Sequence, residues 1–276
     1  MITIDFSGKT VLITGGTKGI GHAAARNFAA AGARLVLTYK WGSADLDAIR
    51  KDFTGLGAPE PIFVQADVSV DDDTDKVMAE IAKVAGKVDI FVSNVGYAAT
   101  MPTLDAYKKR SLFKTLEYST WPLVEYTRAI KKHFGAYPGK VVGISSDGPD
   151  HYYPGYDFVA ASKALLESLG KYLAVHLLKE GSRVNIMRFG TVKTESFTAI
   201  FGEEFFPHIV DAGLITEDLV LKPADCGKAV FALCSGFMDA VNGQVLNVDY
   251  GLPFSDNSMN RFQAMKAREQ VNKNPK

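Results

Sequence analysis

The sequence of 276 residues lacks most features that mark secreted, metal-binding or nucleic-acid-binding proteins. Its two cysteines, Cys226 and Cys234, have no paired motif and no nearby histidine, so we expect buried free thiols rather than a disulfide or a metal site. Thirty-one basic residues balance thirty-one acidic ones, which gives no net charge to attract nucleic acid or an anionic membrane. No run reaches the ~20 apolar residues of a membrane span and the first residues lack a secretory signal, so we expect a soluble cytoplasmic protein.

Short apolar, β-branched runs alternate along the chain with longer helical patterns. The runs are Val11–Thr14, Leu35–Thr38, Ile62–Val64, Ile90–Val92, Val141–Ile144, Val184–Met187 and Val245–Val248. Continuous apolar strands separated by helices indicate a parallel sheet that is covered on both faces. The 47% of apolar residues can fill one sizeable core, so we predict an α/β fold with a single doubly wound Rossmann domain and a seven-stranded parallel sheet. We place this domain at residues 1–254 and a polar C-terminal surface tail at 255–276.

A glycine-rich turn, Thr14-Gly15-Gly16-Thr17-Lys18-Gly19-Ile20-Gly21, follows the first predicted strand and opens a helix. Its glycines permit a tight turn and let backbone amides approach a pyrophosphate, whose charge the helix N-terminus stabilises. The pattern resembles the glycine motif of the short-chain dehydrogenase/reductase family. It predicts a nicotinamide dinucleotide site whose first members are Gly15, Thr17, Lys18, Gly19, Ile20 and Gly21.

The end of the second predicted strand should decide between the two nicotinamide cofactors, because a carboxylate there would bind the ribose diol and repel a 2′-phosphate. That end reads Thr38-Tyr39-Lys40-Trp41 and has no acid. Lys40 and Lys18 are placed to converge on the phosphate. We therefore predict NADPH, with Tyr39 and Lys40 among its contacts; the alternative is that Lys40 is a solvated surface charge.

The family resemblance extends the cofactor site to later strands. Asp67 and Val68 stand at the family's position for an adenine contact, and Ser93-Asn94-Val95-Gly96 resembles its Asn-Asn-Ala-Gly segment. The resemblance implies that Asn94 braces the sheet and that Gly96 keeps the path of the adenosine ribose open. The family's Pro-Gly segment after the sixth strand is replaced by Arg188-Phe189-Gly190-Thr191-Val192-Lys193-Thr194. There, contacts to the carboxamide and the pyrophosphate are expected from Gly190, Val192 and Thr194.

Tyr156 and Lys163 are the candidate catalytic residues. Residues seven apart lie on nearly one face of a helix, roughly 10 Å along its axis, so both side chains can reach one cleft. Hydride transfer creates an oxyanion that a positioned acid must neutralise, and a nearby lysine lowers the pKa of a phenol and can hold the nicotinamide ribose. In most of the family the tyrosine lies four residues before the lysine and thirteen after a serine. From Lys163 and Ser146 both spacings point to Val159, which cannot donate a proton.

A tyrosine three residues earlier lies about 4.5 Å nearer the helix N-terminus. In the reduction of an α,β-unsaturated thioester the hydride enters the β carbon, so the enolate oxygen is displaced by roughly two bonds of ~1.5 Å each. The spacing of Tyr156 and Lys163 resembles the motif of the enoyl-acyl-carrier-protein reductases, in particular their divergent NADPH-dependent branch. That family has a second tyrosine where this chain has Ser146. Tyr152 and Tyr153 are expected to line the acyl channel or to assist; the alternative is an aromatic wall without chemistry.

These observations predict a NADPH-dependent reductase of fatty acid or polyketide biosynthesis that reduces an enoyl thioester linked to acyl carrier protein or coenzyme A. Two alternatives stay open: an atypical ketoreductase that uses Tyr156 or Tyr152, and a non-catalytic NADPH-binding protein of the same fold. The resemblance also implies a homodimer or homotetramer paired through helices at 105–135 and 156–178. The phenylalanine-rich segment 195–214 resembles a mobile substrate lid, although such phenylalanines are more often core. The asparagine of the family's proton relay is missing from residues 111–128.

Overall fold

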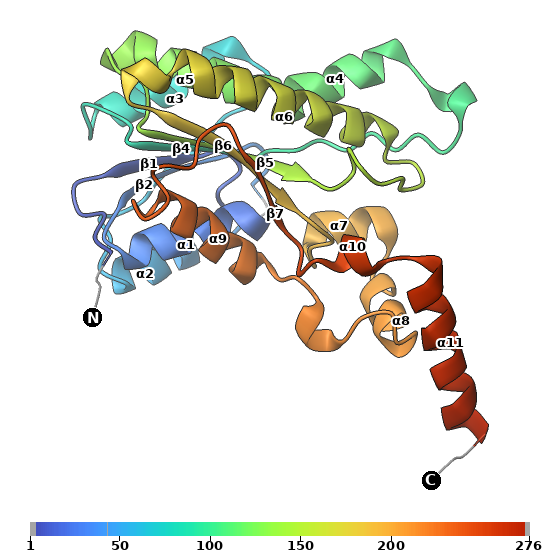
Figure 1. Ribbon diagram of the computed structural model, residues 1–276. Coiled ribbons are helices and arrows are strands. Elements are labelled where there is room, and N and C mark those ends of the chain that lie inside the picture. The colour runs from blue at the N-terminus through green and yellow to red at the C-terminus, as the bar shows by residue number, and fades with distance from the viewer. Residues whose placement is uncertain (1–3, 43, 274–276) are drawn as a thin grey trace.

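The computed structural model describes residues 4–42 and 44–273, which form a parallel sheet with helices on both faces (Figure 1). The strands are β1 (Thr10–Ile13), β2 (Arg34–Tyr39), β3 (Ile62–Gln65), β4 (Ile90–Ser93), β5 (Lys140–Ser146), β6 (Arg183–Phe189) and β7 (Val245–Val248). Their order in the sheet is β3-β2-β1-β4-β5-β6-β7, and each neighbouring pair is parallel. The predicted doubly wound, seven-stranded α/β fold is therefore confirmed, and each predicted strand overlaps an observed one.

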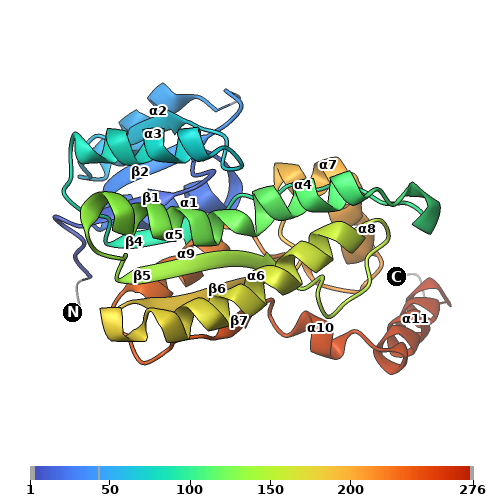
Figure 2. The same cartoon turned by 90° about the horizontal axis from the view of Figure 1, so that it is seen from above.

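Helices cover both faces of the sheet, as Figures 1 and 2 show. One face carries α3 (Asp71–Ala82), α4 (Lys109–Ser119), α5 (Trp121–Phe134) and α6 (Asp157–His176), and the other carries α1 (Gly19–Ala30), α2 (Leu46–Gly55) and α9 (Pro223–Cys234). Because side chains alternate along a strand, Val11 and Ile13 join the core on the α1 side while Leu12 joins the core on the α5 side. Both sets are fully buried, which explains why the strands read as continuous apolar runs.

The order of the strands places one crevice at the carboxyl edge of the sheet. The chain moves outward from β1 through β2 to β3, and then crosses back to begin β4 on the other side of β1. In open α/β sheets ligands bind at this reversal point. The glycine turn and the predicted site segments at 39–40, 67–68, 93–96 and 146 follow the carboxyl ends of these strands, so the fold brings them to one edge.

Several helices from the chain beyond β6 form a lobe beside the carboxyl edge (Figures 1 and 2). It contains α7 (Glu195–Phe201), α8 (Phe205–Asp211), α10 (Leu252–Ser255) and α11 (Ser258–Lys273). Most of the predicted polar tail is thus helix α11, which extends away from the sheet; residues 274–276 of that tail lie outside the described residues. Arg261 holds Asp256 with hydrogen bonds of 2.7 and 2.8 Å, which fixes the start of α11.

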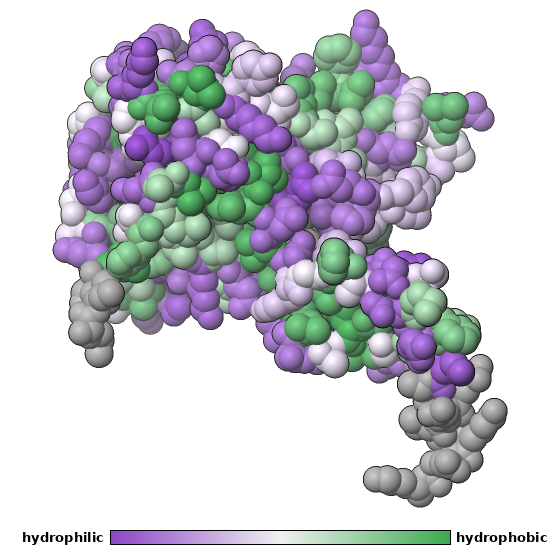
Figure 3. Space-filling view, viewed as in Figure 1, coloured by the Kyte–Doolittle hydropathy of each residue, from purple (hydrophilic) through white to green (hydrophobic). Residues whose placement is uncertain are grey.

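Both cysteines lie in the hydrophobic core. Cys226 and Cys234 on α9 are buried free thiols, as predicted, and burial raises the pKa of each to about 12. Over the part of the chain that the structure describes, no helix has both the length and the apolar character needed to cross a membrane. In the space-filling view, hydrophobic residues gather on the lobe that carries α8 (Figure 3).

Candidate active site

The glycine turn between β1 and α1 has the backbone conformation that a pyrophosphate needs. Gly15 and Gly19 adopt φ angles of 62° and 55°, a left-handed region that residues with a Cβ rarely enter. Lys18 is the N-cap of α1 and makes no side-chain cap hydrogen bond, so the backbone N–H groups of the first turn face outward for an anion. Thr17 is buried within the turn, and Ile20 packs its side chain against the core. The turn therefore fits a dinucleotide.

Asn94 joins the end of β4 to this turn. Its Nδ2 donates hydrogen bonds to the carbonyl oxygens of Thr14 at 3.0 Å and Gly15 at 3.1 Å, and its backbone N–H donates to Thr14 Oγ1 at 3.0 Å. A Cβ added at Gly21 would lie 2.5 Å from the Gly15 oxygen and 2.6 Å from Asn94 Nδ2. Only glycine leaves space for this contact, and Asn94 has the bracing role that the sequence predicts.

Lys40, Asp67 and Tyr118 form a charged cluster where the cofactor ribose is expected. Lys40 forms an ion pair with Asp67 and donates a hydrogen bond to the Tyr118 hydroxyl at 2.5 Å, which in turn donates to Asp67 Oδ2 at 2.8 Å. Partial burial would raise the pKa of Asp67, but hydrogen bonds from Lys40, Ser69 and Tyr118 outweigh it and lower this pKa to about 2. Lys40 is thus an anchored cation at the edge of the site.

A small cavity of about 50 Å³ adjoins this cluster. Of the predicted cofactor residues, its lining includes Gly15, Tyr39, Lys40, Val68 and Gly96. Lys18, by contrast, donates a hydrogen bond to Glu195 of α7 at 2.8 Å. The two lysines that the sequence places on one phosphate therefore have separate carboxylate partners in this structure.

Tyr156 occupies the junction between the loop after β5 and helix α6. It is the N-cap of α6; its backbone N–H donates to the Tyr153 carbonyl at 3.1 Å and its carbonyl accepts from Ala160 at 2.9 Å. The phenol hydroxyl donates to Ser146 Oγ at 3.2 Å. A Cβ at Gly148 would lie 2.7 Å from the Tyr156 ring, so the loop backbone packs directly on the phenol.

Lys163 lies two turns further along α6 and reaches the same edge of the sheet. Its side chain is buried, and Nζ donates a hydrogen bond to the Ile144 carbonyl at 2.8 Å. Nζ also lies 3.6 Å from the position of a Cβ at Gly96, which connects it to the predicted ribose path. Tyr156 and Lys163 thus contact β5 two residues apart, at Ser146 and Ile144, so both side chains lie near the carboxyl end of this strand.

The pKa shifts of Tyr156 and Lys163 differ from the prediction that the lysine lowers the pKa of the phenol. Burial raises the pKa of Tyr156; the hydrogen bond with Ser146 opposes this shift, and the charge of Asp147 reinforces it. Burial also lowers the pKa of Lys163 to about 8, although nearby Glu167 opposes the change. The expectation that Lys163 lowers the phenol pKa is wrong for this conformation, because Nζ contacts Ile144 rather than Tyr156. The phenol stays protonated at neutral pH, as a proton donor requires.

A buried ion pair supports the loop that carries Tyr156. Arg188 of β6 holds Glu167 of α6 through two hydrogen bonds, from Nε to Oε1 at 2.9 Å and from Nη2 to Oε2 at 2.5 Å. Ser145 donates to the same Oε1 at 2.7 Å, and the second Nη of Arg188 pairs with Asp150 in the loop. The Arg188 and Glu167 side chains are 12% and 8% exposed. This network links β5, β6 and α6 to the loop.

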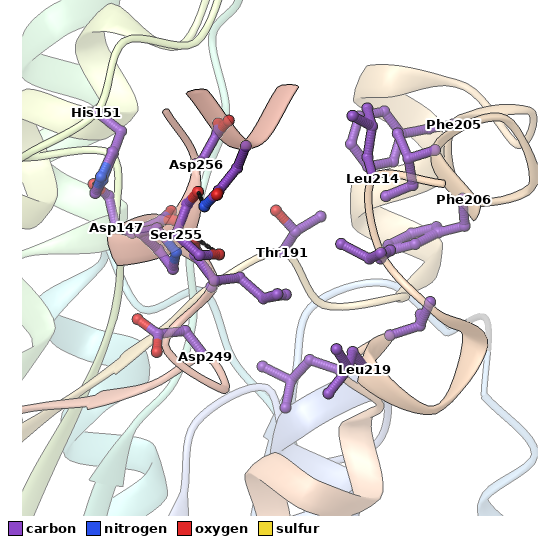
Figure 4. A pocket seen from close by; sticks show the side chains of 18 of the residues that line it. Asp147, His151, Thr191, Phe205, Phe206, Leu214, Leu219, Asp249, Ser255 and Asp256 are labelled. Carbon is purple, nitrogen blue, oxygen red and sulfur yellow. Dashed lines mark hydrogen bonds between the residues drawn. The ribbon is translucent and has the colours of Figure 1, made fainter. Parts of the chain in front are cut away.

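A cavity with a volume of about 640 Å³ lies between the carboxyl edge, the α8 segment and α11 (Figure 4). Phe205, Phe206 and Leu214 form an apolar wall on one side, and the loop with Asp147 and His151 lies on the other. Gly190, where a carboxamide contact is expected, and the adjacent Thr191 also line this space. Its dimensions and mixed lining suit a small organic substrate.

The predicted lid segment is a pair of short helices with a phenylalanine cluster. The ring of Phe197 lies 4.7 Å from Phe201, 5.0 Å from Phe205 and 5.0 Å from Phe206, measured between centroids. Phe205 and Phe206 face the cavity, and Phe201 lies 6.1 Å from the ring of Tyr156. The four rings therefore pack on one another, and two of them, Phe205 and Phe206, also line the cavity; the role as a mobile substrate lid stays a prediction.

The remaining predicted residues lie around the cavity. Tyr153 lines it and donates its hydroxyl to Asp147 Oδ2 at 2.8 Å, while Tyr152 is 82% exposed at the rim. Val192 bridges to Leu221, and Thr194 caps α7 by accepting a hydrogen bond from Phe197 N. The Thr194 methyl lies 3.9 Å from the position of a Cβ at Gly19, which places it beside the glycine turn.

A hydroxyl stands near the position where the relay asparagine of the family is missing. The Ser119 Oγ accepts a hydrogen bond from Tyr97 N at 2.9 Å and donates to the Tyr97 carbonyl at 3.4 Å. These two hydrogen bonds join the segment after β4 to the end of α4. The loop around Gly96 is held in place by this contact, without an amide side chain.

The parallel sheet, the glycine turn and the Tyr156–Lys163 pair define an oxidoreductase of the short-chain dehydrogenase/reductase class. The chain belongs to this family: residues 15–253 match the family model described as Enoyl-(Acyl carrier protein) reductase. Within the family it lies near the enoyl reductases. Membership makes it an oxidoreductase, which argues against the non-catalytic alternative.

Individual relatives have different activities. The chain is 29% identical over 252 residues to the enoyl-(acyl-carrier-protein) reductase (NADH) FabI of Aquifex aeolicus, covering 88% of this chain and 91% of that protein. It is 30% identical over 255 residues to 3beta-hydroxysteroid dehydrogenase 1 of Eggerthella lenta, covering 90% and 95%. A crystal structure of a dehydrogenase/reductase from Sinorhizobium meliloti aligns with a TM-score of 0.80 and 26% identity, covering 91% and 97%. The overall match therefore identifies the family but not the substrate, which has to be inferred from the residues of the site.

Three groups in the site were missed by sequence reasoning. Asp147 follows β5 directly, and a carboxylate at the carboxyl end of a parallel strand was the signal that could have identified it. Tyr118 meets Asp67 across 51 residues of sequence, and Arg188 meets Glu167 across 21. No local sequence pattern predicts those two contacts, because each depends on how a helix packs on the sheet.

Proposed function

We propose that this protein is a NADPH-dependent reductase of the carbon–carbon double bond of an enoyl thioester, carried by coenzyme A or by an acyl carrier protein. The observation that supports this most directly is the position of the phenol. Tyr156 stands before the first turn of α6 with its hydroxyl at Ser146, while position 159, the usual place of the tyrosine, is a buried valine. A displaced acid suits an oxygen that lies two bonds beyond the carbon receiving hydride.

The residues present fit a nicotinamide dinucleotide. The glycine turn and the start of α1 would hold the pyrophosphate, Lys163 would hold the nicotinamide ribose, and Gly190 and Thr191 would border the carboxamide. When bound, NADPH supplies a hydride. The protonated phenol of Tyr156 donates a hydrogen bond to the developing enolate oxygen and stabilises its charge. The α carbon then takes up a proton from solvent, which completes the saturated thioester.

One observation favours a second function, the reduction of a carbonyl. Ser146 and Tyr156 are hydrogen-bonded to each other, and a serine and a phenol together could polarise a ketone oxygen. The relative from Eggerthella lenta is named as a hydroxysteroid dehydrogenase, which acts on this kind of group. The two functions differ in which substrate carbon accepts hydride, so they make different predictions for matched substrates.

The experiment that separates them follows the absorbance of NADPH in the presence of crotonyl and acetoacetyl thioesters. An enoyl reductase oxidises NADPH with the crotonyl thioester and leaves the acetoacetyl thioester unchanged. The opposite result would assign the protein to the ketoreductases. Both thioesters are tested on coenzyme A and on acyl carrier protein, so that failure with one carrier does not hide an activity.

NADPH is expected to bind more tightly than NADH, because Lys40 stands where a carboxylate would favour NADH. The relative from Aquifex aeolicus is named as a NADH enzyme, so the preference rests on this local charge. Lys40→Ala should weaken NADPH by on the order of 1–3 kcal/mol, the value of a charge-assisted hydrogen bond, and change NADH binding little. Fluorescence titration of both cofactors measures the ratio, with Lys83→Ala on the far side as the control. Tighter NADH binding by the wild type would contradict the assignment.

A homodimer or homotetramer is expected, because α6 exposes an apolar stripe on the outer face of the molecule. Leu165, Tyr172 and Val175 on α6 are 40%, 67% and 75% exposed, and Phe113 on the neighbouring α4 is 51% exposed. Contiguous apolar surface of this kind marks an interface. Leu165→Glu should shift the sedimentation of the protein toward the monomer at micromolar concentration, whereas Val84→Glu after α3 should not. A wild-type monomer would refute the expectation.

A further inference from the structure

Asp147 is a buried carboxylate with spare hydrogen-bonding capacity. Its residue is 7% exposed, yet it lines the 640 Å³ cavity. Oδ2 accepts a hydrogen bond from the Tyr153 hydroxyl at 2.8 Å, and within the described ranges this is the only hydrogen bond from another side chain to the carboxylate. A carboxylate has about four acceptor positions, and buried ones are normally filled. The carboxylate lines the cavity, so its remaining acceptor positions are available to a ligand that carries a donor.

Tyr153 makes the same side of the cavity an acceptor surface. Because its hydroxyl hydrogen points at Asp147, the phenol oxygen can only accept a hydrogen bond from anything in the cavity. Across the space the wall is apolar, with Phe205, Phe206 and Leu214 in Figure 4. The cavity therefore suits an apolar ligand that carries one N–H or O–H group on the side of Asp147.

The pair also lies close to the catalytic phenol. The Tyr153 ring is 6.0 Å from the Tyr156 ring, at 85° to it, and Asp147 is the residue after Ser146. In a thioester of pantetheine, the first amide N–H is three bonds beyond the sulfur and on the order of 5 Å from the thioester carbon, given bonds of about 1.5 Å. If the thioester carbonyl oxygen lies at Tyr156, this N–H falls about 5 Å from the thioester carbon, near the loop residues that follow Ser146, of which Asp147 is the first.

We propose that Asp147, held by Tyr153, binds the amide N–H of the pantetheine arm that carries the acyl group. This inference rests on the proposed reduction of a thioester and adds a binding residue and a substrate class to it. The arm is common to coenzyme A and to acyl carrier protein, so the same contact serves both carriers. The contact orients the thioester carbonyl toward Tyr156 while the acyl chain meets the phenylalanine wall.

A matched pair of small substrates tests the contact. The S-crotonyl thioester of N-acetylcysteamine has the amide N–H, and its N-methyl derivative has nearly the same shape without it. For the wild type, kcat/KM with the N–H substrate should exceed that with the N-methyl substrate by about tenfold or more, as a charge-assisted hydrogen bond implies. Asp147→Ala should bring the ratio near one, and Asp147→Asn, which keeps an acceptor oxygen, should restore part of it.

Further variants test the role of Tyr153 and replace Asp147→Ala if that variant does not fold. Tyr153→Phe removes one oxygen and should also lower the ratio, whereas Tyr137→Phe, on a loop after α5, should leave it at the wild-type value. If Asp147→Ala does not fold, a fall of about threefold or more in Asp147→Asn carries the test, because a neutral acceptor binds roughly half as strongly. A ratio that is unchanged in the folded Asp147 variants, or a wild-type ratio of one, overturns the proposal.

The saturated S-butyryl pair separates this inference from the proposed function. If neither crotonyl substrate oxidises NADPH, the proposed reduction fails, and calorimetric binding of the butyryl pair then tests Asp147 by itself. Tighter binding of the N–H compound that is lost in Asp147→Ala supports the contact, and equal binding overturns it. With crotonyl coenzyme A and crotonyl acyl carrier protein, the carrier of higher kcat/KM is the natural source of the amide, and Asp147→Ala must lower kcat/KM for that carrier.

Discussion

Replacing Tyr156 by phenylalanine should lower kcat for a crotonyl thioester by ~10²-fold or more, the usual effect of removing a positioned acid. The change deletes only the hydroxyl that donates to Ser146 and leaves the ring packed against Gly148 and Phe201. Cofactor affinity should therefore change little. Steady-state kinetics with NADPH and a crotonyl thioester give the comparison, and NADPH titration checks that the cofactor site is intact.

Two further variants test whether the loss of turnover is specific to the site. Tyr172→Phe is a matched control on the same helix, and it should retain wild-type turnover because this tyrosine faces outward. Lys163→Ala should damage both turnover and NADPH affinity, since its buried ammonium lies between Ile144 and the path at Gly96. Full activity of Tyr156→Phe would remove the catalytic assignment.

Moving the phenol tests whether its position determines the reaction. The double variant Tyr156→Phe with Val159→Tyr places a tyrosine at the spacing of the carbonyl reductases and should favour acetoacetyl over crotonyl thioesters. Val159 is only 5% exposed, so the larger side chain must displace its neighbours at a cost of typically 1–3 kcal/mol. The melting temperature should be measured beside the activities, so that lost stability is not mistaken for a changed specificity.

Removing Glu167 is expected to be the most destabilising single charge deletion in the site. Glu167→Ala leaves the guanidinium of Arg188 buried with only Asp150 beside it, and breaking a buried pair in this way costs about 3–5 kcal/mol. The free energy of unfolding from urea titration should fall by that amount. Turnover should fall as well, because the loop from Asp147 to Tyr156 loses its anchor on β6.

An exposed pair offers the matched control. Arg26 and Asp52 are also joined by two hydrogen bonds, of 2.9 and 3.3 Å, but their side chains are 53% and 38% exposed. Asp52→Ala should cost no more than about 1 kcal/mol, since solvent screens such pairs. Equal effects of the two substitutions would show that the Arg188–Glu167 pair has no special role in stability.

The sheet could be predicted from the sequence because each strand contains a short apolar run that is recognisable locally. A strand covered on both faces must be apolar at every position, and runs such as Leu35–Thr38 can form little else in a chain of this composition. The glycine turn is equally local, since Gly15 and Gly19 need their φ angles wherever the turn occurs. The ends of α11 had no such signal, because a polar sequence without a clear apolar stripe does not distinguish a helix from a coil.

The site was predictable only where one strand end or one helix carries it. Tyr156 caps α6 and Lys163 lies two turns into it, so their spacing alone predicts that both lie near one edge of the sheet. The partner of Lys40 could not be inferred, because Asp67 and Tyr118 come from another strand and from α4. The protonation of Tyr156 likewise depends on burial beneath Gly148 and beside Asp147, and burial of that kind follows from tertiary packing rather than from local sequence.

The loop between Ser146 and Tyr156 has a consequence for how this protein can vary. Surface loops usually accept insertions, because nothing fixes their length. Here the two ends are joined by a hydrogen bond between side chains, and Asp150 is tied to Arg188 along the way. One added residue would have to break an anchor or move the phenol. Among descendants of this chain, the number of residues in the loop should therefore be preserved more strictly than their identity.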